Sequence, residues 1–377
     1  MSESSPERVT EAPRERSGDP ARAGAGGTPP GDHATQAPNE LVTEALDAVA
    51  GGRDLSAEEA SAVLAEIMAG AVSPEQIAGF LIALRAKGET VEELVGLART
   101  MRRLAIPVHA RAGDLLDTAG TGGGSRTFNV STTAALIAAG AGCAVAKHGN
   151  RSATGPSGSA DLLEALGARI DLEPDAVARC IEEAGFGFMF APAHHQATRT
   201  VAGVRRALAV RTIFNFLGPL TNPAGARRQL IGISDPRYLE TIAGALARLG
   251  VDRALVVAGD DGLDELSASA ATRIIEVNGE EIRAYTVTPG DLGIVAAAEE
   301  VPTGGTPEQN AALTRAILAG EPGAARELAL INAGAAIYAA GGAQSLLAGI
   351  ELAREAIDDG RAAGALERFV AATHASP

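Results

Sequence analysis

After Pro107 the sequence alternates short apolar or β-branched runs with helical segments, and this alternation constrains the fold more than any other feature. A parallel sheet whose strands are joined by helices requires such alternation. We expect a strand ending at Leu115 and Leu116, and further strands over residues 142–146, 168–172, 186–190, 229–233 and 254–257. The Asn278-Gly279 dipeptide predicts a hairpin between residues 273–277 and 281–287. The predicted fold class is α/β with a mostly parallel central sheet.

The helices expected between these strands begin at residues that favour helix starts. Residues 131–141 are predicted as one helix, Ser159 as the cap of a second that ends at Gly167, and Pro174 as the start of a third. From Pro307 onward the chain is Ala-rich and helical, with glycines between the segments. Residues 107–377 are therefore predicted to form one α/β domain.

A smaller helical domain is predicted over residues 39–106. Three capping boxes open amphipathic segments there, and they pair Ser56 with Glu59, Ser73 with Gln76, and Thr90 with Glu93. Residues 1–38 are rich in Pro, Gly, Ser, Glu and Arg and carry almost no large apolar side chains. Because such a segment cannot offset the entropy lost on ordering, we expect it to be a disordered tail.

The acidic composition limits the expected partners. The chain has 32 Lys and Arg against 47 Asp and Glu, which gives a net charge of −15. This sign repels nucleic acid and anionic lipid, so we expect neither a nucleic-acid partner nor a membrane partner. The longest apolar stretch, residues 133–146, is interrupted by two glycines and is shorter than the roughly 18 residues of a membrane span. The first residues are charged and carry no apolar segment, so the expected location is cytoplasmic.

Residues 117–132, DTAGTGGGSRTFNVST, form a glycine-dense loop between a predicted strand and a predicted helix. Glycines at 122–124 permit positive φ, and Thr127, Asn129, Ser131 and Thr132 supply donors beside a helix N-terminus. This combination predicts phosphate binding. The glycine spacing matches neither a P-loop nor a dinucleotide fingerprint. The alternative interpretation is a flexible turn capped by Ser131.

A second loop, residues 147–159 with the sequence KHGNRSATGPSGS, again lies between an apolar run and a helix. Lys147 and Arg151 bring positive charge into an acidic protein, and Asn150 can donate and accept hydrogen bonds. Two such loops in series predict one polyanion bound from two sides. The alternative is a solvated, charged loop.

Carboxylates and cations elsewhere are candidates to complete a site. The segment 254–267, ALVVAGDDGLDELS, carries four carboxylates, and its Asp264 and Glu265 are oxygen ligands suited to Mg²⁺. Its other two acids, which precede Gly262, are interpreted as turn residues. In the segment 204–222 the arginines Arg205, Arg206 and Arg211 are candidates to bind a carboxylate, and Arg206 is more simply a surface residue. Of His194 and His195, at most one is expected to face the site, because adjacent side chains point in different directions.

Taken together, the motifs GTGG, TFNVST, KHGNRS, GSAD, VRR, FNFLGPLTNP and GLDELS occur in the order and spacing of one family. From about Leu41 to its C-terminus the chain resembles the anthranilate phosphoribosyltransferases. The resemblance implies transfer of the phosphoribosyl group of 5-phosphoribosyl-1-pyrophosphate (PRPP) to anthranilate, which is the second step of tryptophan biosynthesis from chorismate. It also implies two Mg²⁺ per monomer, a homodimer joined through the helical domain, and residues of about 200–222 packed against that domain.

The resemblance assigns roles to individual residues. It implies PRPP contacts in the first loop at Gly120, Thr121, Gly122, Gly123, Gly124, Thr127, Asn129, Val130, Ser131 and Thr132. In the second loop it implies them at Lys147, His148, Gly149, Asn150, Arg151, Ser152, Ala153, Thr154, Gly155 and Ser159. It implies anthranilate contacts at Gly120, His148, Asn150, His195 and Arg205, of which His148 and Arg205 are the catalytic candidates. The implied Mg²⁺ ligands are Ser131, Asp264 and Glu265.

Two departures from the family pattern stand in the phosphate loops. Gly124 replaces the Asp that usually follows GTGG, and the loop is one residue shorter. We expect PRPP binding to survive, with Arg126 adding positive charge. The second departure is residues 153–156, Ala-Thr-Gly-Pro, where the family has a serine-rich stretch. There Thr154 replaces one hydroxyl and Pro156 stiffens the loop.

Two other functions are compatible with this architecture. A pyrimidine nucleoside phosphorylase has a similar two-domain organisation, but its phosphate motifs differ from GTGG and KHGN. A non-enzymatic nucleic-acid-binding relative of the fold is opposed by the net charge of −15.

Overall fold

The computed structural model describes residues 37–152, 155–294 and 301–375, and these residues belong to one compact unit. Residues 1–36 of the predicted tail, together with Ala153 and Thr154, lie outside the described residues. No helix in the described ranges is both long and apolar enough to cross a membrane.

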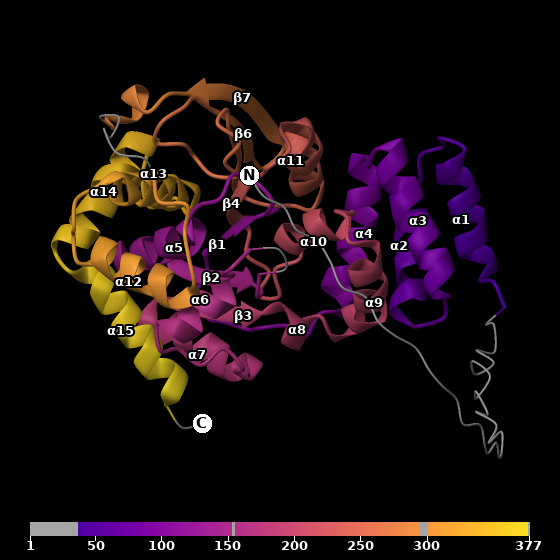
Figure 1. Cartoon of the computed structure of the whole chain (residues 1–377), viewed down its shortest axis with the longest axis horizontal. Helices are drawn as coiled ribbons and strands as arrows, with labels where there is room; N and C mark the ends of the chain where they lie inside the picture. Colours follow the sequence, from indigo (N-terminus) through magenta and orange to yellow (C-terminus); the bar gives the residue numbers. More distant parts are fainter. Residues whose placement is uncertain (1–36, 153–154, 295–300, 376–377) are drawn as a thin grey trace, which may run out of the picture. The chain divides into compact units, whose positions relative to one another are not determined.

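The N-terminal part of this unit is helical (Figure 1). Its helices are α1 (Glu40–Ala50), α2 (Ala57–Met68), α3 (Pro74–Lys87) and α4 (Val91–Leu104). The capping boxes at Ser56 and Thr90 are complete, as predicted. The box predicted at Ser73 is only half formed. Its hydroxyl accepts the Gln76 N–H, but the Gln76 side chain binds Asn39 and Thr43 instead.

The larger part is built on a mixed sheet. Its strands are β1 (Leu115–Gly120), β2 (Ala144–Gly149), β3 (Phe186–Phe190), β4 (Arg228–Gly232), β5 (Arg253–Gly259), β6 (Thr272–Asn278) and β7 (Glu281–Val287). The order is β3-β2-β1-β4-β5-β6-β7, parallel from β3 to β5 and antiparallel beyond it. The predicted α/β fold class with a mostly parallel sheet is thus confirmed. The predicted hairpin is also present, as β6 and β7.

Helices cover both faces of the sheet (Figure 1). They are α5 (Val130–Gly140), α6 (Ser159–Ala165), α7 (Pro174–Ala184), α8 (Ala191–His194), α9 (Arg199–Leu208), α10 (Phe214–Leu220), α11 (Leu239–Arg248), α12 (Pro307–Leu318), α13 (Ala324–Ala339), α14 (Leu346–Asp358) and α15 (Arg361–His374). Short 3₁₀ turns lie at Gln196–Thr198, Pro236–Tyr238 and Gly290–Leu292.

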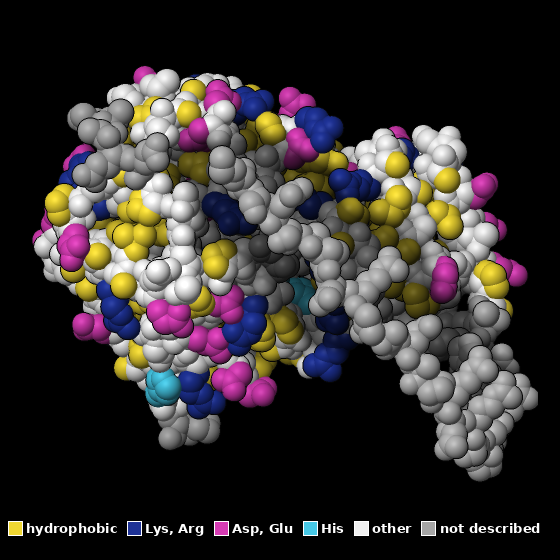
Figure 2. Space-filling model, in the orientation of Figure 1, with side chains coloured by type: hydrophobic (Ala, Val, Ile, Leu, Met, Phe, Trp, Pro, Cys, Tyr) yellow, Lys and Arg dark blue, Asp and Glu magenta, His cyan; other side chains and the backbone are white. Residues whose placement is uncertain are grey.

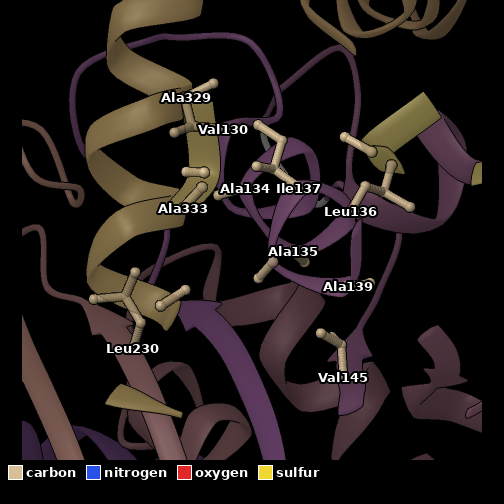
Figure 3. Packing of buried hydrophobic residues seen from close by; sticks show 14 of the residues in the cluster. Val130, Ala134, Ala135, Leu136, Ile137, Ala139, Val145, Leu230, Ala329 and Ala333 are labelled. Carbon is tan, nitrogen blue, oxygen red and sulfur yellow. The ribbon is translucent and has the colours of Figure 1, made fainter. Parts of the chain in front are cut away.

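Helix α5 lies at the centre of the larger core. Every residue of α5 except Ser131 is buried, and its small side chains let α13 and the sheet pack closely around it (Figure 3). In Figure 3, Ala134 lies near Ala333 of α13, with Leu230 and Val145 of the sheet below. A Cβ at Gly140 would come within 2.5 Å of the Ala362 backbone, so only glycine permits α15 to approach this end of α5.

The segment 199–220 packs on the helical part of the chain. Val201 and Val204 of α9, with Phe214 and Leu217 of α10, belong to the same buried cluster as the cores of α2, α3 and α4. The cluster continues into one face of β4, β5 and β6. One apolar core therefore joins the N-terminal helices to the sheet.

Three predicted boundaries were wrong. Strand β1 begins, rather than ends, at Leu115. Strand β2 runs on to Gly149, because residues 145–149 pair with β3, so Lys147 and His148 lie on a strand. Ser159 is the first residue of α6 and not its cap. The free N–H of Gly158 is bound instead by the Asp161 carboxylate.

The strand predicted over residues 168–172 was also wrong. These residues form no regular element. Ala168 and Ile170 are buried in the core, but the Arg169 N–H donates to Thr373 Oγ1 of α15. The apolar run therefore anchors α15 and does not pair with another strand.

We expect Glu93→Ala to destabilise the helical part by about 3 kcal/mol, because a buried carboxylate that satisfies several donors would be lost. Glu93 is fully buried and accepts from the Leu55 and Thr90 backbone N–H groups and from Lys87 Nζ. Urea unfolding measures the change. The control is Arg354→Ala, which breaks an exposed pair with Glu351 and should cost less than about 0.5 kcal/mol. A cost below about 1 kcal/mol for Glu93→Ala would contradict the expectation.

Candidate active site

A cavity of about 750 Å³ opens at the carboxyl ends of β1 and β2. Ligands commonly bind at this edge of a parallel sheet. Every predicted site residue within the described ranges lines the cavity. On the face shown in Figure 2, basic side chains and a histidine lie around a hollow, while acidic and basic side chains are interspersed over the rest. Met101 of α4 also reaches the wall, so the N-terminal helices contribute to the site.

The glycine loop after β1 is held by side chains that donate to its backbone carbonyls. Gly122 and Gly123 have φ of 65° and 81°, in the region that favours glycine. The Gly122 carbonyl accepts hydrogen bonds from Ser234 Oγ at 2.9 Å and from the Arg211 guanidinium, which also donates to the Thr121 carbonyl. Arg211 therefore anchors this loop, whereas the sequence had made it a candidate to bind a carboxylate. Its own carbonyl accepts from Arg85 of α3 at 2.8 Å.

Gly124 is explained by its neighbours. A Cβ there would lie 2.8 Å from Asp264 Oδ1 and 2.9 Å from the Gly262 carbonyl. The next residue, Ser125, donates its N–H to Gly262 and its hydroxyl to the Asp261 carbonyl. The shortened loop is thus bonded to the acidic loop and leaves no room for the Asp of the family pattern.

The N-terminus of α5 points donors at the cavity. Asn129 occupies the N-cap position but makes no side-chain cap hydrogen bond, so Ser131 is not the cap residue that the alternative interpretation had assumed. Thr132 Oγ1 is buried without a hydrogen-bond partner among the described residues. An unpaired hydroxyl and a helix N-terminus in one cavity wall are suited to an anion.

Asp264 and Glu265 lie beside this helix end and the glycine loop. Asp264 Oδ2 accepts the Gly122 N–H at 3.0 Å, and the Ser131 N–H donates to Glu265. Burial raises the pKa of Asp264, and burial together with the Asp264 charge raises the pKa of Glu265 well above its usual range. Two close, desolvated carboxylates favour a divalent cation.

The donor set fits Mg²⁺ better than a metal that needs an all-protein cage. Within the described ranges no cluster of three or more His, Cys, Asp or Glu side chains could hold a metal. Mg²⁺ in proteins usually binds one or two carboxylates, and waters and substrate phosphates complete its coordination. Asp264 and Glu265 could supply the carboxylates, and the hydroxyl of Ser131 could supply a further ligand. Of the neighbouring acids, Asp261 accepts from the Ser267 and Ser269 hydroxyls, which is typical of a turn residue.

Lys147 lies beneath the phosphate loops rather than in solvent. It is 2% exposed, and its Nζ donates to the Thr118 carbonyl and hydroxyl and approaches Ser131 Oγ at 3.4 Å. Burial lowers its pKa to about 8, and the nearby Asp117 and Glu265 carboxylates oppose that shift. Its ammonium thus neutralises buried acids under the site.

The sequence analysis gave no role to Asp117. Its carboxylate is fully buried and accepts from the His148 N–H at 3.1 Å and from the Asn222 amide at 2.8 Å. Asn222 also donates to the Ala146 carbonyl. Asp117 therefore fixes the backbone of β2 where His148 enters the cavity.

The two cavity histidines are neutral. The rings of His148 and His195 lie edge to face with centroids 5.0 Å apart. Burial lowers the pKa of His148 to about 3 and that of His195 to about 4. His148 Nδ1 lies 3.2 Å from the Gly218 carbonyl, which can only accept, so Nδ1 carries the proton. Its buried Nε2 is then an acceptor without a partner among the described residues.

His194 points away from the cavity, with Nδ1 2.9 Å from the Ile106 carbonyl. Only His195 of the adjacent pair lines the cavity, as predicted. Arg205 of α9 is half-buried, and its guanidinium lies 5.2 Å from the Phe214 ring centroid. Burial lowers its pKa, and Arg205 is one of the residues that line the cavity. Arg206, on the same helix, is exposed.

Arg151 does not bring free positive charge to the cavity. Its guanidinium pairs with Asp161 at 2.8 Å and with Glu164 at 2.5 Å. The Asn150 side chain accepts the Arg151 N–H, and the Asn150 carbonyl accepts from Ser159 Oγ. These bonds set the path of the second loop.

Several lining residues carried no sequence signal of their own. They are Met101, Phe214, Asn215, Leu217, Thr303 and Asn310. Asn310 follows Glu308 and Gln309 at the start of α12, so its residue type does not set it apart, and nothing local connects it with a loop about 180 residues earlier.

Comparisons with known proteins agree with this geometry. Residues 112–363 match the model of the glycosyl transferase family a/b domain, and residues 43–105 match that of its helical bundle domain. The anthranilate phosphoribosyltransferase of Symbiobacterium thermophilum is 52% identical over 330 residues, covering 87% of this chain and 97% of the relative.

Solved structures are similar as well. The structure of anthranilate phosphoribosyltransferase (TrpD) from Thermus thermophilus is 48% identical, with a TM-score of 0.83, over 88% of this chain and 99% of that one. The Saccharomyces cerevisiae enzyme in complex with PRPP and Mg is 26% identical, with a TM-score of 0.80, over 89% of this chain and 98% of that one.

Proposed function

The chain belongs to the anthranilate phosphoribosyltransferase family, and we propose that the cavity between β1, β2 and α10 is where it performs the family reaction. That reaction transfers the phosphoribosyl group of PRPP to the amine of anthranilate, giving N-(5-phosphoribosyl)anthranilate and pyrophosphate. It is the second step of tryptophan biosynthesis from chorismate. The observation that carries the proposed site is that the predicted phosphate, acid and anthranilate residues of the described ranges line one cavity.

PRPP binding is assigned to the two loops. The backbone of Gly123 and Gly124, the Thr132 hydroxyl and the N-terminus of α5 face the diphosphate from one side. The N–H groups of Thr121 and Gly122 already donate to the Gly232 carbonyl and to Asp264. Residues 147–152 and 155–159, which run from the end of β2 to the first residue of α6, line the other side. These donors are fixed before substrate arrives, so they stabilise the charge that develops on the leaving pyrophosphate without reorganising.

Mg²⁺ is assigned to Asp264, Glu265 and Ser131, with two ions per monomer. When bound, the metal neutralises the diphosphate and makes it a better leaving group. Gly122 and Ser131 donate backbone N–H groups to the two carboxylates and so orient them. The close approach of Asp264 to the glycine loop joins the acids to the diphosphate site.

Anthranilate is assigned to the wall formed by Arg205, Asn150 and the two histidines. Arg205 supplies a guanidinium for the carboxylate, and the Phe214 ring limits its motion. The aromatic amine is neutral at pH 7, so attack on the anomeric carbon depends on placement more than on a strong base. His148 Nε2 has a free lone pair and can accept the proton released after attack.

The chain is further proposed to act in the cytoplasm as a homodimer joined through residues 39–106. Leu41 of α1 and Ile82 of α3 are large apolar side chains that are 40% and 39% exposed. Helices α1 and α3 pack against each other, so both residues belong to one helical layer. A mass near twice 38.0 kDa by light scattering supports the dimer, and a mass of 38.0 kDa rejects it.

Arg205→Ala should raise the KM for anthranilate roughly ten- to hundredfold, because a charge-assisted carboxylate contact is worth about 1.5–3 kcal/mol. The KM for PRPP should change less than about twofold. The assay follows the loss of anthranilate fluorescence on adding PRPP and Mg²⁺, with thymidine plus phosphate as the test for phosphorylase activity. Arg206→Ala, on the exposed side of the same helix, is the matched control. Equal changes in both KM values would remove the assigned role.

Asp264→Asn and Glu265→Gln should each raise the Mg²⁺ concentration for half-maximal turnover at least about tenfold, because a hard anionic ligand becomes neutral. Metal content at saturating pyrophosphate should fall below the two ions per monomer expected of the unaltered protein. Asp260→Asn is the control, since Asp260 is exposed and pairs with Arg273. An unchanged Mg²⁺ dependence would exclude either acid from the site.

A further inference from the structure

The side chain of Asn129 is bonded to protein on both sides of its amide. Its Oδ1 accepts from Ser157 Oγ at 3.0 Å and from Asn310 Nδ2 at 2.8 Å. Its Nδ2 donates to the Ser157 carbonyl at 3.1 Å. Asn129 ends the first phosphate loop and Ser157 lies in the second, so this amide links the two loops directly.

Asn310 completes the link from a distant part of the chain. It is 3% exposed and lies in the first turn of α12, which Figure 1 shows beside α6. Its Oδ1 accepts the Gly305 N–H at 2.8 Å while its Nδ2 donates to Asn129. Both ends of its amide are therefore hydrogen-bonded. The oxygen accepts from the approach segment, which is defined as residues 303–305 before α12, and the nitrogen donates to the first loop.

The approach segment itself rests on the first loop. Gly304 has φ of 74°, and a Cβ there would lie 2.5 Å from the Thr127 carbonyl. Thr303, next to it, lines the same cavity. Residues 303–305 thus form a wall against the first loop, and Asn310 holds that wall in place.

We propose that Asn310 is a positioning residue for PRPP, which sets the spacing of the two phosphate loops through Asn129. The proposal rests on the assignment of both loops to PRPP. A diphosphate bound from two sides needs both sets of donors at fixed separation, since small displacements weaken several hydrogen bonds together. Asn310 touches the loops at the point where they meet.

Attachment of α12 to α5 does not depend on this bond. One turn further along α12, Thr314 Oγ1 lies 3.1 Å from Thr133 Oγ1 of α5. Thr314 is fully buried and does not line the cavity, while its partner Thr133 also donates to the Asn129 carbonyl. Thr314→Val is therefore a matched control, because it removes a side-chain hydrogen bond between the same two helices, α12 and α5, outside the cavity.

The experiment compares Asn310→Ala, Asn129→Ala, the double variant and Thr314→Val. Steady-state kinetics give the KM for each substrate, calorimetry gives the affinity for pyrophosphate with Mg²⁺, and thermal unfolding reports stability. Asn310→Ser is the second variant at this position, because its hydroxyl is too short to span to Asn129 and it removes less volume.

We expect Asn310→Ala to raise the KM for PRPP at least fivefold and to weaken pyrophosphate to a similar degree, with the KM for anthranilate within twofold. The double variant should be no more than twofold worse than the worse single variant, because both substitutions break one link. Thr314→Val should lower the unfolding temperature and leave both KM values within twofold. If Asn310→Ala does not fold, Asn310→Ser is held to the same criteria.

Two results would overturn the proposal: parallel changes in both KM values, or effects of Asn310→Ala and Asn129→Ala that multiply in the double variant. An unchanged KM for PRPP in Asn129→Ala would instead reject the assignment of the first loop to PRPP. A change in Asn129→Ala without one in Asn310→Ala would reject only the positioning role. The two failures are therefore distinguishable.

Discussion

The burial of α5 along its length is the constraint on which the site depends. A helix surrounded by α13, α15 and the sheet cannot shift without opening the core, so its N-terminus is fixed at the carboxyl edge of β1 and β2. Alanine and glycine make this burial compatible with close neighbours, as the contact of Gly140 with Ala362 shows. The glycine loop therefore covers a helix end whose position is set by the packing of α5, and this packing determines where an anion could bind.

Charge inside the cavity is arranged by desolvation. Lys147 lies under the loops with Asp117 and Glu265 nearby, so a buried cation partly balances buried acids. The two histidines are kept neutral, and the Gly218 carbonyl selects the tautomer of His148 that exposes a lone pair. A protein with a net charge of −15 can thus hold a polyanionic substrate, because the local field, rather than the total charge, governs binding.

Much of the fold, and many of the residues that line the cavity, could be predicted from the sequence, because glycine clusters, caps and strand-to-loop transitions indicate local conformation. The two phosphate loops, Asp264 with Glu265, and the hairpin at Asn278 are all marked locally. The errors have tertiary causes. The pattern of residues 168–172 predicts a strand, but the Arg169 N–H donates to Thr373 of α15 instead. Ser159 is predicted as a helix cap, but the Asp161 carboxylate accepts the Gly158 N–H in its place.

The residues that sequence analysis passed over act across long separations. Asp117 accepts hydrogen bonds from His148 on β2 and from Asn222. Asn310 donates to Asn129, which lies about 180 positions earlier in the chain. Neither residue type nor spacing reveals such a partner, since the contact exists only after the sheet has formed.

The anchoring of Arg211 makes the glycine loop and helix α3 mechanically dependent on each other. The guanidinium of Arg211 donates to the carbonyls of Thr121 and Gly122, and the Arg211 carbonyl accepts from the guanidinium of Arg85 on α3. A rotation of the N-terminal helices would pull on the phosphate loop, and a loop tightened by a bound diphosphate would resist that rotation. Through Arg211 and Arg85 the glycine loop is therefore linked by hydrogen bonds to the helical layer that carries Leu41 and Ile82.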